Sequence, residues 1–440
     1  MHEMQGVEPA QKTRSLVVST VAFTVCFAVW TIFSIIGIKI KQNLGLNDSE
    51  FGLLVATPVL TGSLSRIFLG IWTDQYGGRI VYFLLMITTS IAVWLLSTVS
   101  TYPMYLLAAL GVGLAGGSFA VGIAYVSRWF EASKQGTALG IFGMGNVGAA
   151  ITNFGAPFLL VAYGWENVAR IYAVILFAMA LIFWITTEED PVTRVRKEKG
   201  TKIRPALMQL APLKHLRVWR FATYYFFVFG GYVALALWLP RYYMGAYGLE
   251  IGTAGMLAAT YALPGSIFRA LGGWMSDKIG ARRVMYITFI GSLICLFFMS
   301  YPATDYVVHG IEGPIHFTLA IGLVPFVILT IILGFLMSLG KAAVYKHIPV
   351  YYPDHVGSVG GLVGMIGGLG GFVLPVCFGV MNDLIGIWTS CFMLLFVIVG
   401  VSLVWMHVSI IMANRAQYPE LQGVSQDLPE IMNGKDEIYP

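Results

Sequence analysis

The sequence is poor in charge. Only 11% of its 440 residues are Asp, Glu, Lys or Arg, and 57% are hydrophobic, whereas a typical soluble domain has about 25% charged residues. A chain with so few charges cannot cover a water-exposed surface of this size, but helices that face lipid are apolar. The composition therefore excludes an ordinary soluble protein and predicts an integral membrane protein.

Reactive motifs are also scarce. The cysteines lack the spacing of a metal site or a disulfide framework. They are Cys26, Cys295, Cys377 and Cys391. We find no zinc-protease, serine-hydrolase or nucleotide-loop motif, so no enzyme activity, catalytic residue, metal or cofactor is expected. A sensor would carry a soluble signalling domain, and only 27 mostly polar residues follow the last apolar segment.

Long apolar runs are abundant. A helix needs about 20 apolar residues to cross the hydrocarbon core of a bilayer, and the shorter runs are interrupted by glycine rather than by charge. We predict an all-α integral membrane protein with twelve transmembrane helices. Their expected ranges are 16–40, 51–72, 79–99, 102–127, 136–162, 168–187, 219–242, 252–275, 283–301, 317–345, 356–382 and 387–413.

The basic residues are distributed unevenly between the two sides. With twelve spans, both termini lie on one side, and 20 of the 27 Lys and Arg residues fall there, against four on the other side. Positive residues near span ends mark the cytoplasmic side. We therefore expect a multi-pass protein of the cytoplasmic (inner) membrane with both termini in the cytoplasm.

The chain also contains an internal repeat. Residues 62–79 and 265–282 match at an offset of 203 positions, with seven of 18 residues identical. This repeat predicts two homologous six-helix halves, and transporters built from such parallel repeats bind substrate near the midplane between them. The expected parts are a cytoplasmic tail (1–15), a bundle (16–187), a basic solvated linker (188–217), a second bundle (218–413) and a cytoplasmic tail (414–440).

Each copy of the repeat carries an arginine inside a span, Arg66 in "GSLSRIFLG" and Arg269 in "GSIFRALGG". A charge at this depth costs several kcal/mol unless it faces the bundle interior and finds partners. None of the 22 Asp and Glu residues falls near the centre of a span, so the counter-charge is expected to be the substrate. Two planar guanidinium groups suit a small planar anion, which excludes sugars, cations and lipophilic drugs.

The end of each repeat resembles a known loop motif. "GIWTDQYGGR" and "GWMSDKIGAR" resemble the cytoplasmic loop motif of the major facilitator superfamily. The resemblance implies the major facilitator fold, with twelve transmembrane helices in two pseudo-symmetric six-helix bundles. In this motif Asp74 and Asp277 are expected to have structural and gating roles, pairing with a neighbouring helix end.

The glycine-rich fifth and eleventh spans, "GIFGMGNVGAAITNFGAP" and "GSVGGLVGMIGGLGGFVLP", are similar to the paired signatures of the nitrate/nitrite porters (NarK-type). Their glycines, Gly143 and Gly364 among them, are expected to allow close helix packing and gating. The resemblance implies a nitrate site with two arginines, polar donors and aromatic walls. Its residues would be Arg66, Arg269, Tyr225, Asn146, Phe119 and Phe229.

The sequence leaves two modes of energy coupling open, proton symport and exchange. "GKAAVYKHIPVYYPDHVGSVGG" (340–361) resembles the nitrate/proton symporter subgroup, whereas Asn153 stands where that subgroup is expected to have lysine. Lys341 and His347 are the candidates for proton coupling. Our leading hypothesis is nitrate import by proton symport through alternating access; the alternatives are a nitrate/nitrite antiporter and a small organic anion porter.

The expected partners follow from this hypothesis. They are a small inorganic anion (nitrate, with nitrite open), protons and the lipid bilayer. No nucleic acid is expected, and the chain is expected to act as a monomer.

Overall fold

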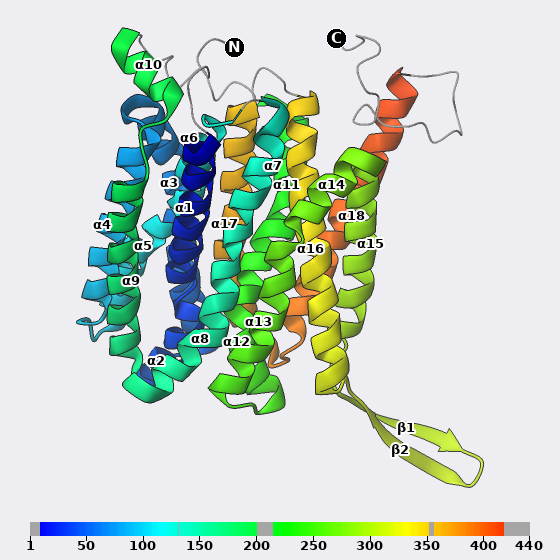
Figure 1. Cartoon of the computed structure of the whole chain (residues 1–440). Helices are drawn as coiled ribbons and strands as arrows, with labels where there is room; N and C mark the ends of the chain where they lie inside the picture. Colours follow the sequence, from blue (N-terminus) through cyan, green and yellow to red (C-terminus); the bar gives the residue numbers. More distant parts are fainter. Residues whose placement is uncertain (1–8, 131, 200–213, 352–355, 418–440) are drawn as a thin grey trace.

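The computed structural model describes residues 9–130, 132–199, 214–351 and 356–417. Within them, twelve helical segments are long and apolar enough to cross a membrane, and they stand side by side in one bundle (Figure 1). Helix α1 begins and α18 ends at the same end of the bundle, which we call the N/C end. A two-stranded hairpin projects from the opposite end, the hairpin end.

The first half holds α1 to α9, and a short helix α10 follows it. The bounds are α1 (Pro9–Trp30), α2 (Phe33–Leu44), α3 (Asp48–Tyr76), α4 (Gly78–Leu96), α5 (Tyr102–Gly113), η2 (Leu114–Gly117), α6 (Ser118–Ser127), α7 (Ala132–Gly143), η3 (Met144–Val147), α8 (Gly148–Tyr163), α9 (Trp165–Thr186) and α10 (Pro191–Lys199).

The second half holds the remaining elements. The bounds are α11 (Leu216–Tyr225), η5 (Phe226–Gly231), α12 (Tyr232–Tyr247), α13 (Ile251–Ile267), α14 (Arg269–Ile279), α15 (Ala281–Met299), β1 (Thr304–Gly310), β2 (Gly313–Leu319), α16 (Leu323–Tyr351), α17 (Val356–Ile385) and α18 (Ser390–Gln417).

The two copies of the repeat turn at the same glycine. Gly77 separates α3 from α4 with φ 98°, and Gly280 separates α14 from α15 with φ 88°. Only glycine adopts such angles without strain, which explains why both copies have it. Just before this turn in the second copy, Asp277 pairs with Lys346 near the end of α16. Asp74 belongs to α3, and its side chain is outside what the structure describes.

One predicted span is wrong at its start. The expected helix 317–345 begins at Leu323, because Phe317, Thr318 and Leu319 belong to strand β2. Strand β2 pairs antiparallel with β1 from Thr304↔Leu319 to Gly310↔Gly313. A short apolar run of this kind fits a strand as well as a helix, so the pattern could not separate the two.

The ends of the chain and the linker are partly described. Helix α1 starts at Pro9 and α18 continues to Gln417, so both helices extend past the expected spans. The first part of the linker forms α10, where the Asp190 side chain accepts a hydrogen bond from the backbone of Thr193 (2.8 Å). Residues 1–8, 200–213 and 418–440 lie outside the described residues.

Several spans depart from α-helical geometry partway along their length. Turns with 3₁₀ geometry interrupt the fourth and fifth spans (η2 and η3), and a π-helical turn, η5, interrupts the seventh. Such interruptions often mark functional positions in a helix. In this chain they precede or contain three of the predicted site residues, Phe119, Asn146 and Phe229.

Candidate anion-binding site

The two repeated arginines come from different halves of the bundle. Arg66 lies within α3, and Arg269 is the first residue of α14. Both side chains are buried, with exposed fractions of 5% and 8%. No ion pair among the described residues includes either of them. Two buried cations thus have no carboxylate partner in the part of the chain that the structure describes, an arrangement that is unfavourable without an anionic partner.

Backbone carbonyl groups orient the first arginine. Nη1 of Arg66 donates to the carbonyl oxygen of Gly364 at 2.9 Å, and its Nε donates to that of Gly116 at 3.4 Å. Gly364 belongs to α17 of the second half, so this bond crosses between the halves. A carbonyl dipole fixes the orientation of a guanidinium group but leaves its net charge in place.

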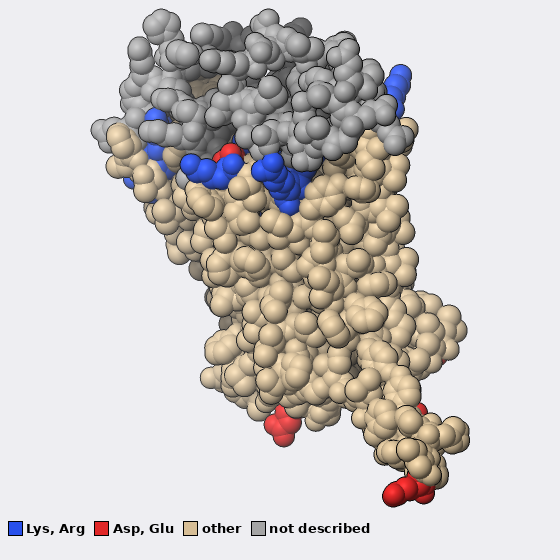
Figure 2. Space-filling view, turned by 90° about the vertical axis from the view of Figure 1, so that its right-hand side faces the viewer, with Lys and Arg blue, Asp and Glu red and all other residues tan. Residues whose placement is uncertain are grey.

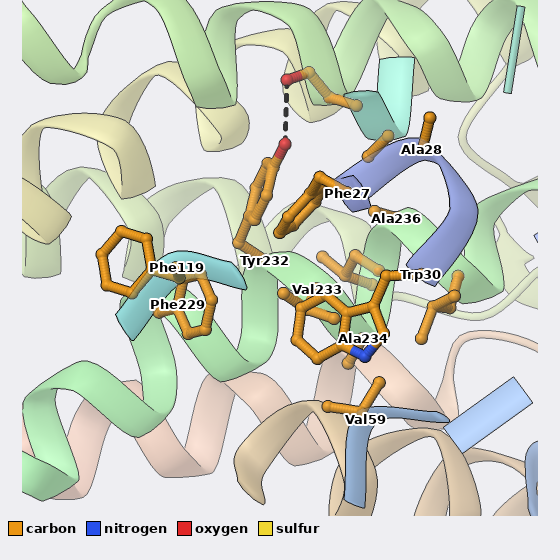
Figure 3. Packing of buried hydrophobic residues seen from close by; sticks show 14 of the residues in the cluster. Phe27, Ala28, Trp30, Val59, Phe119, Phe229, Tyr232, Val233, Ala234 and Ala236 are labelled. Atoms are coloured by element: carbon orange, nitrogen blue, oxygen red, sulfur yellow. Dashed lines mark hydrogen bonds between the residues drawn. The ribbon is translucent and has the colours of Figure 1, made fainter. Parts of the chain in front are cut away.

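Aromatic rings face both guanidinium groups. The ring of Phe119 lies 5.3 Å from Cζ of Arg66 and 5.5 Å from Cζ of Arg269. Phe229 and Trp30 lie 5.4 and 5.8 Å from Cζ of Arg66. Figure 3 shows these three rings in the packed core. They stabilise the cations by cation–π contacts and keep the surroundings apolar.

The two signature glycines lie against the arginines of the opposite half. A Cβ atom on Gly143 would meet Arg269 at 3.4 Å, and one on Gly364 would meet the Tyr345 hydroxyl at 2.7 Å and Nη1 of Arg66 at 3.8 Å. A side chain at position 364 would therefore displace atoms around the site. The glycines that we expected to serve packing and gating thus also shape the surroundings of both arginines.

Tyrosines complete the side of the site formed by the second half. The Tyr225 ring stacks on Phe229, with centroids 5.0 Å apart and planes at 8°. Tyr345 meets Tyr225 edge-on at 5.0 Å, and its centroid lies 5.8 Å from Cζ of Arg269. The Tyr345 hydroxyl donates to the carbonyl oxygen of Gly360 at 3.1 Å.

Several buried polar atoms of residues assigned to the site have no hydrogen-bond partner among the described residues. They are Nη1 of Arg269, the Tyr225 hydroxyl, both amide atoms of Asn146 and the Ser63 hydroxyl. An unsatisfied buried polar group costs about 1–3 kcal/mol. Most of these atoms donate hydrogen bonds, so the residues present fit an anion with several oxygen atoms.

The two candidates for proton coupling lie on α16. The side chain of Lys341 is fully buried; its Nζ donates to the carbonyl oxygen of Gly265 and lies 3.5 Å from the centroid of the Tyr232 ring. His347 is 3% exposed, and its Nδ1 lies 2.8 Å from the carbonyl oxygen of Ala343. Lys341 therefore borders the part of the site that the second half forms, six residues before His347.

The sequence reasoning missed three residues that contact the site. Trp30 and Tyr345 face the guanidinium groups, and Ser63 lies near Arg66 beside Gly368. Ser63 is repeated as Ser266 in the second copy, so the repeat itself was a signal for it. Trp30 had no comparable signal, because α1 presents many large apolar residues.

At the hairpin end, the carboxylate of Asp48 connects the two halves. The Asp48 side chain, 12% exposed, lies 3.1 Å from Nζ of Lys41 in its own half. From the other half it accepts hydrogen bonds from Nη2 of Arg241 and Nδ2 of Asn382, both at 3.1 Å. Asp48 therefore connects α2 and α3 of the first half with α12 and α17 of the second.

A second carboxylate makes the reciprocal contact. Asp383 of α17 accepts hydrogen bonds from the backbone N–H groups of Asp48 (3.1 Å) and Ser49 (2.7 Å) and from the Ser49 hydroxyl. These N–H groups belong to the first turn of α3, where a negative charge is favourable. We call Lys41, Asp48, Ser49, Arg241, Asn382 and Asp383 the hairpin-end lock.

Asn153 has a related role closer to the middle of the bundle. Its Oδ1 accepts from the Ser34 hydroxyl at 2.7 Å, and its Nδ2 donates to the carbonyl oxygen of Ala236 in the other half at 3.0 Å. The residue that departs from the symporter pattern thus makes a neutral contact between the halves.

Comparison with known proteins agrees with this architecture. The chain matches the Major Facilitator Superfamily over residues 18–325 and 243–426. It is 42% identical to a Thermus thermophilus protein described as a probable nitrate/nitrite antiporter NarK1, over 92% of this chain and 93% of that one. It is 31% identical to the probable nitrate/nitrite transporter NarK2 of Mycobacterium tuberculosis, over 84% and 89%.

Solved structures share the fold at low sequence identity. A bacterial homologue of the human lysosomal transporter Spinster, in an inward-facing and unoccupied conformation, has a TM-score of 0.64 at 19% identity, with 86% of this chain and 84% of that one covered. The nucleoside transporter NupG has a TM-score of 0.66 at 14% identity, with 90% and 99% covered. The chain is thus a multi-pass membrane transporter that belongs to the major facilitator superfamily and, within it, to the NarK-type nitrate/nitrite porters.

Proposed function

We propose that this protein imports nitrate across the cytoplasmic membrane by proton symport, through alternating access. The observation that carries the proposal is the pair of buried arginines, one from each half, that face shared aromatic rings and have no carboxylate partner among the described residues. Nitrate is planar, carries one negative charge and has three oxygen atoms, which matches the unsatisfied donors beside the arginines.

The orientation of the protein in the membrane follows from the distribution of charge. Lys and Arg side chains gather at the N/C end, whereas acidic side chains mark the hairpin end on the face shown in Figure 2. Under the positive-inside rule, the N/C end faces the cytoplasm. The hairpin-end lock then holds the two halves together on the outer side of the site.

The coupling proposal depends on energetics. An anion that enters a cell with a negative interior moves uphill by about 2.3 kcal/mol per 100 mV. One co-transported proton cancels the charge, so a proton gradient can then drive uptake. Lys341 and His347 are our candidates for the proton carrier, and the 340–361 segment, which resembles the symporter subgroup, supports symport.

Nitrate/nitrite exchange is the second candidate function. It is favoured by the 42% identical relative described as a probable antiporter. It is also favoured by the sequence, in which no Asp or Glu falls near the centre of a span to carry a proton. Exchange of two monovalent anions is electroneutral and needs no proton. The two functions therefore predict opposite requirements for internal nitrite.

Nitrate uptake into proteoliposomes separates them. With no internal nitrite, an inward proton gradient is expected to drive nitrate accumulation that a protonophore abolishes. Uptake that ignores the gradient but requires internal nitrite would instead establish the antiporter. Competition by formate or oxalate at concentrations near that of nitrate would favour the organic anion porter.

Two neutral side chains should contribute to affinity. The change Tyr225→Phe removes a hydroxyl group, and Asn146→Ala removes an amide group; neither group has a hydrogen-bond partner among the described residues. Each is expected to weaken nitrate binding by about 1.5–3 kcal/mol, because the hydrogen bond would be made to a charged ion. Calorimetric titration of purified protein measures this loss, and Tyr163→Phe, an exposed tyrosine of α8, is the matched control. Unchanged affinity in both variants would assign these residues to packing.

A further inference from the structure

The eighth span is interrupted beside its arginine. Helix α13 ends at Ile267, Phe268 has φ −74° and ψ 5°, and α14 begins at Arg269. The corresponding span of the first half, α3, runs without interruption from Asp48 to Tyr76. The position of the Arg269 side chain therefore depends on how the end of α13 is held.

A buried lysine holds that end. Lys341 donates its hydrogen bond to the carbonyl oxygen of Gly265, four residues before Arg269. Its ammonium group lies over the ring of Tyr232, whose hydroxyl is 2.8 Å from that of Ser266. The Tyr232 hydroxyl also donates to the backbone carbonyl oxygen of Ala262 in α13 at 3.1 Å, and Figure 3 shows the Tyr232 ring with a hydrogen bond at its hydroxyl. Lys341 thus ties α16 and α12 to the last turn of α13.

The same face of α16 also reaches Arg269 directly. Tyr345 lies four residues after Lys341, and residues at this spacing share one face of a helix. Its ring contacts both Arg269 and Tyr225. Helix α16 therefore touches the arginine through Tyr345 and supports the preceding helix end through Lys341.

The groups that face Lys341 include no carboxylate partner among the described residues. Helix α12 contributes Tyr232, and α13 contributes Tyr261, whose hydroxyl bonds the sulfur of Met337 at 3.3 Å. Helix α14 contributes Arg269, which carries the same sign of charge as the ammonium group and lies four residues after Gly265, whose carbonyl oxygen Lys341 contacts. Lys341 and Arg269 repel each other, and an anion bound to Arg269 reduces that repulsion.

The residues of α15 and η5 that approach Lys341 have no titratable side chain. Helix α15 and the turn η5 approach Gly340, the residue before Lys341, through Thr288 and Val228. The positive charge of Arg269 on α14 is therefore the charge near Lys341 that a bound anion would offset.

We propose that Lys341 carries the co-transported proton and couples it to the anion through the end of α13. The proposal rests on the nitrate/proton symport proposed above. As an ammonium, Lys341 makes a charge-assisted hydrogen bond to Gly265 and a cation–π contact with Tyr232. As an amine, it loses the contribution of charge to both contacts. Proton binding thus tightens the helix end beside Arg269, and proton loss loosens it.

The linkage gives a simple cycle. Nitrate bound to Arg269 favours the ammonium form of Lys341, so one proton accompanies one nitrate. Release of nitrate into the cytoplasm restores the repulsion from Arg269, and the proton leaves Lys341. The arginines cannot take this role, because a guanidinium group does not release its proton in proteins.

Two variants of Lys341 test the proposal. Lys341→Gln keeps a hydrogen-bond donor without a titratable proton, and Lys341→Arg keeps the charge but cannot release it. Both are expected to lose nitrate accumulation driven by a proton gradient. Both should keep exchange of labelled external nitrate for internal nitrate at equal pH, because that exchange moves no net proton. Lys39→Gln, an exposed lysine of α2, should keep both activities.

The pH dependence adds a readout that a structural role would not change. The KM of wild-type exchange should rise with pH as Lys341 loses its proton, and the KM of Lys341→Arg should not. Gradient-driven accumulation by Lys341→Gln at the wild-type level would overturn the inference, as would loss of both activities in both variants with unchanged thermal unfolding.

Two further experiments distinguish a failure of the Lys341 proposal from a failure of the symport on which it rests. Loss of accumulation in His347→Gln with exchange retained would make His347 the carrier and overturn the role of Lys341. A wild-type protein that ignores the proton gradient would overturn the symport itself.

Discussion

Replacement of either Arg66 or Arg269 by alanine is expected to abolish nitrate transport, and replacement by lysine should do the same. A charge-assisted hydrogen bond contributes about 1.5–3 kcal/mol, and each 1.4 kcal/mol corresponds to about a tenfold change in affinity. The loss of two such bonds from one guanidinium group would weaken binding at least about a hundredfold.

Lysine fails for a geometric reason. Nη1 of Arg66 bonds the Gly364 carbonyl while the guanidinium plane faces Phe119 and Phe229, which leaves its other N–H groups for the anion. A lysine ammonium is a point charge without this planar fork, so it cannot serve the carbonyl and two anion oxygens in the same geometry. The same reasoning applies to Arg269, whose Nη1 has no partner among the described residues.

The experiment pairs binding with transport. Calorimetric titration with nitrate and uptake into proteoliposomes would be measured for all four variants, with thermal unfolding as the folding check. Arg194→Lys serves as the control, because this arginine has a side chain that is 55% exposed. Transport near the wild-type rate in both lysine variants would contradict a site in which two guanidinium groups each make two hydrogen bonds to the anion.

The central features of the site could be predicted because they repeat. Arg66 and Arg269 stand at the same place in two similar segments, and a buried charge is conspicuous in an apolar span. The twelve-span bundle followed from apolar runs long enough to cross a bilayer, and the structure contains twelve such helical segments among its described residues.

Features that depend on distant contacts could not be predicted. The helix is interrupted at Phe268 in the second copy of the repeat but is continuous in the first copy, α3, although the local sequences are similar. Tyr345 reaches Arg269 only because α16 packs against α14. The contact between Asp48 and Asp383 joins residues 335 positions apart, and no local spacing connects them. In each case the partner is chosen by tertiary packing, which a periodic pattern does not contain.

The hairpin-end lock leads to the second large effect. Among the residues that the structure describes, the carboxylate of Asp48 pairs with both Lys41 and Arg241, and its side chain is 12% exposed. Its removal by Asp48→Ala leaves two cations without their shared partner and removes the bond from Asn382. The state that is closed at the hairpin end should lose at least about 1.4 kcal/mol, which shifts the equilibrium between closed and open states about tenfold or more.

Spin labels can measure this shift directly. Leu44 at the end of α2 and Leu384 near the end of α17 are exposed residues of opposite halves, so labels at Leu44→Cys and Leu384→Cys report the separation of the halves at the hairpin end. The native cysteines are buried or half-buried and should label poorly. In Asp48→Ala the distribution of distances is expected to gain a longer component, since the halves are no longer held together.

The control is Glu250→Ala, which removes an exposed carboxylate that precedes α13 and forms no ion pair among the described residues. This variant changes the net charge of the hairpin end by the same amount but should leave the distances unchanged. An identical distribution in Asp48→Ala and wild type would show that apolar helix packing, rather than the lock, keeps this end closed. A longer component that nitrate suppresses would instead show that the lock and the bound anion stabilise the same closed arrangement of the two halves.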